Sequence, residues 1–115
     1  MIARYWRGVT KAQDHGAYLE YLRRTGVADI RKLDGNLGVH LLHRKNGDQA
    51  EFLFISLWDS FDSIRSFSGP RVETAVYYPE DRKFLLELTP EVIHYEAETF
   101  GMPRSAKAGT PFRAR

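Results

Sequence analysis

The fold is decided by the segment EFLFISLWDS at residues 51–60. Side chains alternate between the two faces of a strand, and in residues 51–58 both sets are largely apolar. Leu53, Ile55 and Leu57 share one face. The other face carries Phe52, Phe54, Ser56 and Trp58. A strand with two apolar faces is typical of a sheet that is covered on both sides. Helices of the same chain can cover one side, and we expect a second copy of the chain to cover the other.

The sequence around this strand predicts a single α+β domain. Strands are predicted at residues 2–9, 37–44, 51–58 and 92–99. Helices are predicted at residues 10–33, 60–68 and 79–88, where apolar residues recur at helical spacing. The Asn46-Gly47 pair predicts a tight hairpin between the second and third strands. This order, β-α-β-β-α-(α)-β, is that of the ferredoxin-like split βαβ fold with a four-stranded antiparallel sheet.

The charge of the chain is unevenly distributed. The 115 residues carry a net charge of +2, but residues 101–115 hold four bases and no acid, so residues 1–100 carry a net charge of −2. We therefore expect a folded domain at 1–100 and a basic, mobile tail at 101–115. A nucleic-acid site needs a basic surface, and the folded domain does not supply one. Nucleic-acid binding is therefore disfavoured.

Composition also indicates the compartment. No apolar run approaches the roughly 20 residues that cross a bilayer, and the start MIARYWRG lacks the apolar core of a signal peptide. The chain contains no cysteine, which excludes disulfides, thiolate nucleophiles and cysteine-bound metals. These features predict a soluble, cytoplasmic protein without contact to a membrane.

The sequence offers no evident set of ligands for a metal or cofactor. His40 and His43 are three residues apart on one predicted strand, so they point to opposite faces. His15 and His94 belong to other predicted elements. No glycine-rich phosphate loop and no G-x-S-x-G turn is present. We therefore expect no cofactor, and any chemistry has to come from the substrate.

The remaining candidates for a binding site are aromatic and basic. An aromatic-lined pocket takes a hydrophobic ring compound, with a few polar groups fixing its orientation, although the same aromatic residues equally suit a plain core. Arginines near the pocket could stabilise an anionic ligand, and a histidine could add a polar group. The candidate residues are Trp58, Phe54, Tyr77, Trp6, Arg4, Arg7, His43 and Arg82.

The motifs together resemble the antibiotic biosynthesis monooxygenase superfamily. The first strand carries Tyr5-Trp6-Arg7-Gly8, and the segment at 52–60 is followed by Ile64-Arg65-Ser66-Phe67. The junction from strand through Trp58-Asp59-Ser60 to helix is the most recognisable element, and the resemblance covers residues 1–98. It implies a protomer that pairs through its sheet into a dimeric α+β barrel.

The resemblance implies a function only in outline. Some members oxidise polycyclic phenols to quinones without a cofactor, and others degrade haem. Trp58 matches the junction tryptophan of the quinone-forming enzymes, but Phe54 stands in place of their pocket asparagine and Ile64 near their helix tyrosine. The axial histidine of the haem degraders falls near Val76 or Tyr77. We therefore expect either a cofactor-independent monooxygenase of phenolic compounds or a non-catalytic, ligand-binding or structural homodimer.

Overall fold

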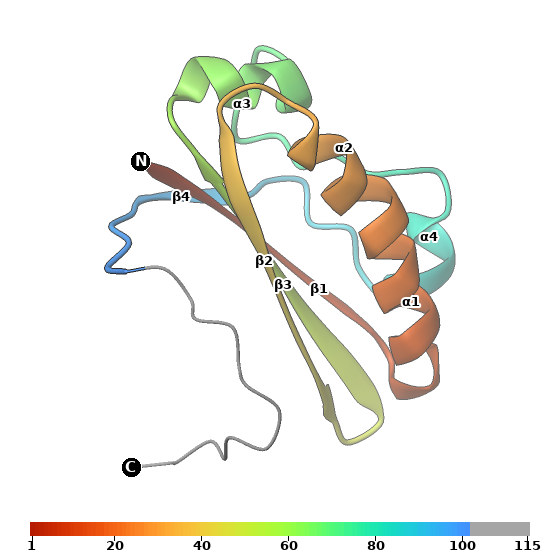
Figure 1. The fold of residues 1–115 in the computed structure, drawn as a ribbon. Coiled ribbons are helices and arrows are strands. Elements are labelled where there is room, and N and C mark those ends of the chain that lie inside the picture. Colours follow the sequence, from red (N-terminus) through yellow and green to blue (C-terminus); the bar gives the residue numbers. More distant parts are fainter. Residues whose placement is uncertain (102–115) are drawn as a thin grey trace.

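A four-stranded antiparallel sheet forms the centre of the computed structural model, which describes residues 1–101 (Figure 1). Its strands are β1 (Ile2–Lys11), β2 (Asn36–Asn46), β3 (Gln49–Trp58) and β4 (Ile93–Glu96), in the spatial order β2-β3-β1-β4. This order confirms the predicted ferredoxin-like α+β fold. Residues 102–115, most of the expected tail, lie outside the described residues.

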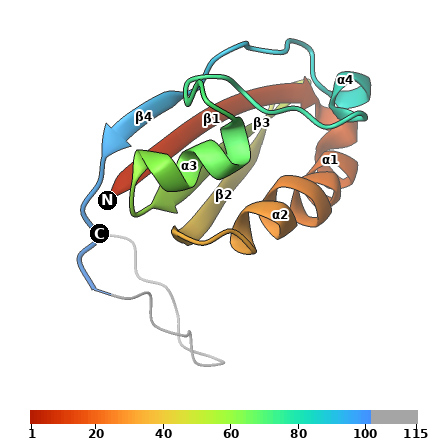
Figure 2. The same cartoon turned by 90° about the horizontal axis from the view of Figure 1, so that it is seen from above.

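The helices lie on one side of this sheet (Figure 2). They are η1 (Ala12–Asp14), α1 (His15–Leu22), the π-helical turn η2 (Arg23–Val27), α2 (Ala28–Arg31), α3 (Phe61–Ser68) and α4 (Asp81–Phe84). None of the helices in residues 1–101 combines the length and hydropathy of a membrane-spanning segment. Within residues 1–101, helices cover only one face of the sheet.

The core lies between this covered face and the helices. Phe52 and Trp58 of β3 are fully buried, and Phe54 is nearly so. Tyr18 from α1 and Ile64 from α3 pack against the same cluster and are also fully buried. Burial of each such side chain stabilises the fold by roughly 1.5–3 kcal/mol. The aromatic face of residues 51–58 is thus the helix-covered one.

The opposite face of the sheet is apolar and has no cover within residues 1–101. Strand register places Leu53, Ile55 and Leu57 there, half-buried in the middle of the sheet. Around them, the exposed apolar side chains on the same face are Leu42, Ile93 and Tyr95 (46 %, 52 % and 54 % exposed), and His40, which is paired with Ile55, is also exposed there. We call the six apolar residues the open face. Its polar margin holds Glu51, whose carboxylate accepts bonds from both Arg7 and Arg44 at 2.6 and 2.8 Å.

Two predicted helices are shorter than expected because strand pairing competes with them. Thr10 and Lys11 pair with Ala50 and Gln49 on β3, so the first helical segment begins after them. Leu85 has an extended backbone and forms an isolated β-bridge with Thr10. The N–H of the next residue, Leu86, donates to the carbonyl of Val9 at 3.0 Å. The third predicted helix, 79–88, is therefore reduced to α4.

The other differences are local. The predicted strand at 92–99 is paired only over β4. The tight turn of the hairpin consists of Gly47 and Asp48 rather than Asn46 and Gly47, and Gly47 has a φ of +64°. Such a φ is accessible to glycine without a steric cost. Asp59 and Ser60 both have side chains that can cap α3, and the structure shows that Ser60 does so, because its Oγ accepts the N–H of Ser63 at 3.2 Å.

Candidate functional site

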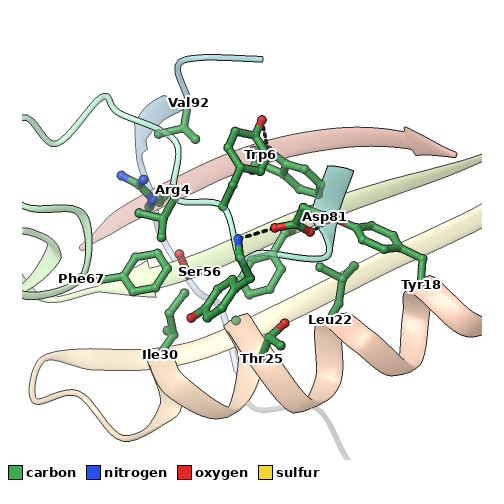
Figure 3. A pocket seen from close by; sticks show the side chains of 15 residues that line it. Arg4, Trp6, Tyr18, Leu22, Thr25, Ile30, Ser56, Phe67, Asp81 and Val92 are labelled. Atoms are coloured by element: carbon green, nitrogen blue, oxygen red, sulfur yellow. Dashed lines mark hydrogen bonds between the residues drawn. The ribbon is translucent and has the colours of Figure 1, made fainter. Parts of the chain in front are cut away.

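A cavity opens between the covered face of the sheet and the first helical segment (Figure 3). Its empty volume is about 510 Å³, a figure that counts the open space at its mouth. Six of its fifteen lining residues are aromatic, and they are Trp6, Tyr18, Phe54, Phe67, Tyr77 and Tyr78. Apolar walls with a few polar groups are typical of small-molecule sites.

The π-helical turn η2 shapes one wall of the cavity. A π turn inserts an extra residue into a helix and is frequent at functional sites. Here it brings Thr25 and the buried Gly26 to the cavity lining. A Cβ at Gly26 would lie 3.3 Å from Cε2 of Phe54, so the absence of a side chain lets the ring pack against the helix backbone. A glycine within the predicted helix at 10–33 suggests an interruption of the helix, but nothing in the sequence indicates that it contacts a cavity.

Arg4 forms a buried positive end of the cavity. Its side chain comes from β1 and is 4 % exposed. The guanidinium donates to the carbonyl oxygen of Val72, and its Nη2 donates to the carbonyl of Thr74 at 2.7 Å. It also lies 5.8 Å from the ring centroid of Phe67, within cation–π range. Burial lowers the pKa of Arg4 to about 10, so the group remains a cation near neutral pH.

His94 on β4 supports Arg4 from the side. Its Nε2 lies 3.3 Å from Nη1 of Arg4. Since a guanidinium only donates, Nε2 of His94 accepts and its proton sits on Nδ1. Burial, and then the neighbouring cation of Arg4, lower the pKa of His94, while Glu73 opposes this shift. A neutral His94 therefore fits beside a charged Arg4.

A buried carboxylate lies across the cavity from Arg4 (Figure 3). Asp81 is 4 % exposed. Its Oδ1 accepts the hydroxyl of Tyr18 at 2.8 Å, and its Oδ2 accepts the backbone N–H of Tyr78 at 2.6 Å. Burial and the carboxylate of Asp81 raise the pKa of Tyr18. The Tyr18 hydroxyl therefore stays protonated and donates to Asp81.

The other tyrosine hydroxyls at the cavity are also engaged. Tyr77 donates to the carbonyl of Thr89 at 2.5 Å and accepts the indole N–H of Trp6 at 3.2 Å. Tyr78 donates its hydroxyl to Oδ2 of Asp29 at 2.6 Å. Burial, followed by the bond to Asp29, raises the pKa of Tyr78. These bonds hold the aromatic walls in fixed orientations.

Four of the eight residues singled out in the sequence lie together at this cavity: Arg4, Trp6, Phe54 and Tyr77. They come from β1, β3 and the irregular segment before α4. Arg4 and Trp6 are two residues apart and lie on the same face of β1, and Trp6 is paired with Phe54 on the neighbouring strand. The strand register therefore brings three of the four residues to one face.

The other four lie elsewhere. Trp58 is fully buried in the core beneath α3 and does not line the cavity. Arg7 has the opposite strand parity from Arg4, so it lies on the uncovered side, bonded to Glu51. His43 lies on the covered side but far along β2, bonded to His15 at 2.9 Å. Arg82 is exposed on α4. The structure therefore does not bring these four candidates to the cavity that Arg4 lines.

The most informative residues that the sequence did not indicate as site residues are Asp81 and Phe67. The position of Asp81 early in a predicted helix suggested a first-turn acid, and Phe67 suggested a core residue. Both interpretations explain their local role but not the cavity, which forms only when the segment at 70–80 crosses the sheet. No local spacing signals such a crossing.

The donor groups of the site do not fit haem or a metal ion. No histidine or cysteine is among the residues that line the cavity, and its tyrosine hydroxyls are bonded to protein acceptors. Within residues 1–101, no group of three or more His, Cys, Asp and Glu side chains is arranged to hold a metal. Axial ligands of haem iron are His, Cys, Met or Tyr side chains, and the only ones of these among residues 1–101 that line the cavity are the bonded tyrosines.

Comparisons with known proteins connect the fold to solved structures. A candidate antibiotic biosynthesis monooxygenase from Bacillus cereus matches with a TM-score of 0.60 and 14 % identity, over 87 % of this chain and 97 % of that one. Another from Deinococcus radiodurans matches at 0.58 and 19 %, over 89 % and 98 %. The heme degrader MhuD from Mycobacterium tuberculosis, solved with two hemes in its active site, matches at 0.54 and 15 %, over 88 % and 99 %.

In comparisons of sequence, no family model and no curated protein matches the chain. At these identities the likeness is one of fold. The chain therefore has the fold of the antibiotic biosynthesis monooxygenase proteins, as its sequence resemblance implied.

Proposed function

On the premise of this shared fold, we propose that the protein binds a planar phenolic compound in the cavity and oxidises it with dioxygen, without haem or metal. The carrying observation is the buried guanidinium of Arg4 at one end of an aromatic-walled cavity. Aromatic walls favour a flat ring, and a buried cation favours the anion of an acidic hydroxyl. The solved heme degrader of the same fold is a precedent for a ring-shaped ligand.

The proposed chemistry uses the electrons of the substrate. An anthrone-type phenol loses a proton, and the resulting anion reduces dioxygen. The ring methylene becomes a carbonyl that keeps one oxygen atom, and the other oxygen leaves as water. The substrate loses four electrons and dioxygen gains four. The protein contributes by excluding water, orienting the ring and stabilising the anion through Arg4.

A matched pair of arginine variants tests this function. Purified protein is mixed with anthrone in air, and anthraquinone is measured by chromatography with ¹⁸O₂ to label the new carbonyl. We expect conversion above that of heat-denatured protein. Arg4→Met should lower it by roughly tenfold or more, since loss of one preorganised charge contact typically costs 10²–10³ in rate. Arg82→Met, exposed and away from the cavity, should leave conversion unchanged. No conversion above the background would overturn the oxygenase.

One observation favours a second candidate, a ligand-binding protein without catalysis. The hydroxyls of Tyr18, Tyr77 and Tyr78 all donate to acceptors of the protein itself. None is left to donate to a reacting oxygen in this arrangement. Tight binding of anthrone with no turnover in wild-type protein would select this alternative.

The proposed functional unit is a homodimer that pairs through the open face. Leu53, Ile55 and Leu57 form the centre of this face, and Leu42, Ile93 and Tyr95 surround it. An exposed apolar patch on this scale is typical of a protein interface. Pairing of two such sheets would also shield the strands that carry Arg4 and Trp6. We expect a cytoplasmic protein, in keeping with its composition.

A further inference from the structure

The cavity contains two buried charges of opposite sign, and neither has a counter-charge. Arg4 and Asp81 are each 4 % exposed and both line the cavity. No ion pair within 4.0 Å joins either of them to another side chain of residues 1–101. Buried charges in proteins are normally paired or bound to a metal. Two unpaired buried charges at a single cavity therefore indicate that a bound ligand supplies their polar partners.

Arg4 retains an unused donor. Its Nη atoms bond to the carbonyls of Val72 and Thr74 and to His94. These partners are all neutral. Its Nε–H has no acceptor within residues 1–101, and no fully buried polar atom of these residues lacks a partner. The unpaired Nε is therefore not fully buried, and because Arg4 lines the cavity, its Nε–H is the donor available to an incoming anion.

Asp81 retains acceptor capacity in the same way. It accepts two bonds, from Tyr18 and from the N–H of Tyr78, while an ionised carboxylate has about four acceptor positions. Both of its donors are neutral. The carboxylate repels an anion and attracts a hydrogen-bond donor. Arg4 and Asp81 therefore distinguish the two ends of a ligand that lies between them (Figure 3).

We propose that the ligand is a bipolar aromatic compound, with an ionised acid group at Arg4 and a hydroxyl that donates to Asp81. This rests on the proposed function, because it assumes that the cavity takes a ring compound, and it narrows the substrate to the hydroxyaryl acids. The aromatic walls hold the ring, and the two charges set its direction. For such a substrate Arg4 binds the acid group instead of the ionised hydroxyl of a simple phenol, and the Asp81 carboxylate receives the proton of the hydroxyl.

A series of matched naphthalene compounds tests the assignment on the full-length protein. At pH 7.5, 6-hydroxy-2-naphthoate carries both groups, 2-naphthoate only the acid, and 2-naphthol only the hydroxyl. Calorimetric titration should show that 6-hydroxy-2-naphthoate binds at least about tenfold more tightly than either of the others, as expected for one additional charge-assisted bond.

The variants assign each end of the ligand. Arg4→Met should remove the advantage of 6-hydroxy-2-naphthoate over 2-naphthol. Asp81→Asn should remove its advantage over 2-naphthoate. Exposed controls, Arg82→Met and Asp34→Asn, should change neither ratio. If a variant does not fold, as judged by thermal unfolding, the ratios of wild-type affinities still decide the question.

The outcomes separate the two proposals. Equal affinity of 2-naphthol and 6-hydroxy-2-naphthoate for wild-type protein overturns the bipolar ligand but leaves the phenol site standing. Equal losses for all three compounds in Arg4→Met also overturn it, because they indicate a structural role. Failure of all three to bind wild-type protein overturns the phenol site and the bipolar ligand together.

Discussion

Trp58 donates its indole N–H to Oγ of Ser56 across 2.8 Å, with both side chains fully buried on the covered face of β3. Residues two apart on a strand share a face, so the bond runs along the strand. Ser56 lines the cavity and Trp58 does not. The junction tryptophan, Trp58, therefore packs in the core next to the cavity and is not in contact with a ligand bound there.

Trp58→Phe should therefore affect stability more than binding. It leaves the buried Oγ of Ser56 without its donor and removes ring volume, which should lower the free energy of unfolding by about 1–3 kcal/mol. Affinity for 2-naphthol should change by less than about threefold. Urea unfolding and calorimetry measure the two quantities. Ser56→Ala completes a double-mutant cycle, and a large loss of affinity with unchanged stability would contradict the assignment.

Ligand binding should be reported by the fluorescence of Trp6 rather than Trp58. Trp6 lines the cavity and its indole N–H bonds to the hydroxyl of Tyr77, so a bound ring changes its surroundings. Anthrone or 2-naphthoate should quench wild-type protein and Trp58→Phe, but not Trp6→Phe. Quenching that survives in Trp6→Phe and disappears in Trp58→Phe would place the ligand elsewhere.

Acidification should destabilise the fold through His94. Burial and the cation of Arg4 hold the pKa of His94 below its usual value of 6.5. The unfolded chain therefore binds a proton at higher pH than the folded one, so the free energy of unfolding falls as the pH drops through 6.5 toward the folded pKa. The midpoint of urea unfolding should be lower at pH 5.5 than at pH 7.5.

His94→Gln should reduce this pH dependence, since glutamine does not titrate. His15, whose pKa is also lowered, by burial and by His43 and Lys45, should account for the dependence that remains. His40→Gln, which removes a histidine on the uncovered side of the sheet opposite Ile55, is the comparison variant. An unchanged slope in His94→Gln would contradict the proposed coupling to Arg4.

A charge at the centre of the open face should prevent dimer formation. Ile55→Asp places a carboxylate between Leu53 and Leu57 and opposite Tyr5 and His40, where pairing of two copies would remove it from water. Light scattering after size exclusion should give twice the chain mass of 13.3 kDa for wild-type protein and the single mass for the variant. Ala17→Asp, exposed on α1, should stay dimeric. A monomeric wild-type protein would refute the dimer.

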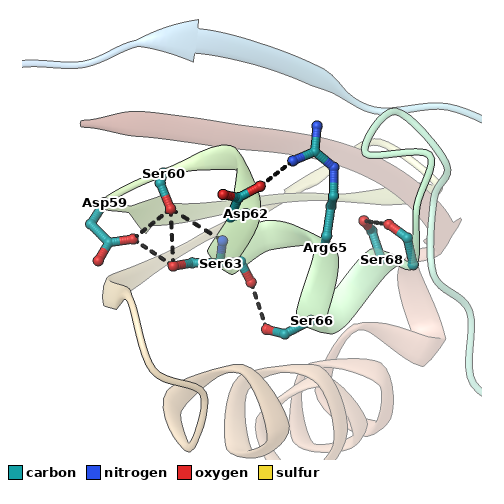
Figure 4. Close-up of polar contacts among 8 residues, drawn as sticks. Asp59, Ser60, Asp62, Ser63, Arg65, Ser66 and Ser68 are labelled. Carbon is teal, nitrogen blue, oxygen red and sulfur yellow. Dashed lines mark hydrogen bonds and ion pairs between the residues drawn. The ribbon is translucent and has the colours of Figure 1, made fainter.

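Gly35 should be much less tolerant of substitution than Gly47. Both have positive φ values, +86° and +64°. A Cβ at Gly35 would lie 2.0 Å from Oγ of Ser63 and 2.6 Å from Oδ1 of Asp59, whereas nothing lies within 4 Å at Gly47. Asp59 accepts the hydroxyl of Ser63 at 2.6 Å in the cluster that begins α3 (Figure 4).

Gly47→Ala should accordingly cost about 1 kcal/mol, the backbone cost of a left-handed conformation. Gly35→Ala should cost at least about 3 kcal/mol, because the clash with Ser63 and Asp59 adds to it. Urea unfolding of both variants measures the difference. Equal losses would mean that the cluster at the start of α3 rearranges freely.

Most of the fold could be predicted from local patterns. The alternation in β3, the hairpin glycine and the cap at Ser60 each act over a few residues, and each is visible in the sequence. The predictions were wrong for segments whose conformation depends on a strand that is distant in the sequence. Residues 85 and 86 have helical spacing, but hydrogen bonding of this segment to β1 keeps it extended.

The site could be predicted only in part. Arg4 and Trp6 share a strand face with each other, and their parity alone separates them from Arg7. Nothing in the sequence separates Trp58 from Phe54, since both occupy the same face of β3. Position along the strand decides between them, because α3 covers one end of the sheet and the cavity opens over the middle.

By itself, the sequence determined the α+β topology, the two apolar faces of β3, and the absence of cysteine chemistry, because strand period and composition are local properties. Only the tertiary structure decided which of these faces the helices cover and which polar groups share the cavity. Arg4 and Asp81 are 77 positions apart, and they line one space because the chain after α3 folds back over the sheet. Their common burial, and the unpaired charges that result, are properties of that packing.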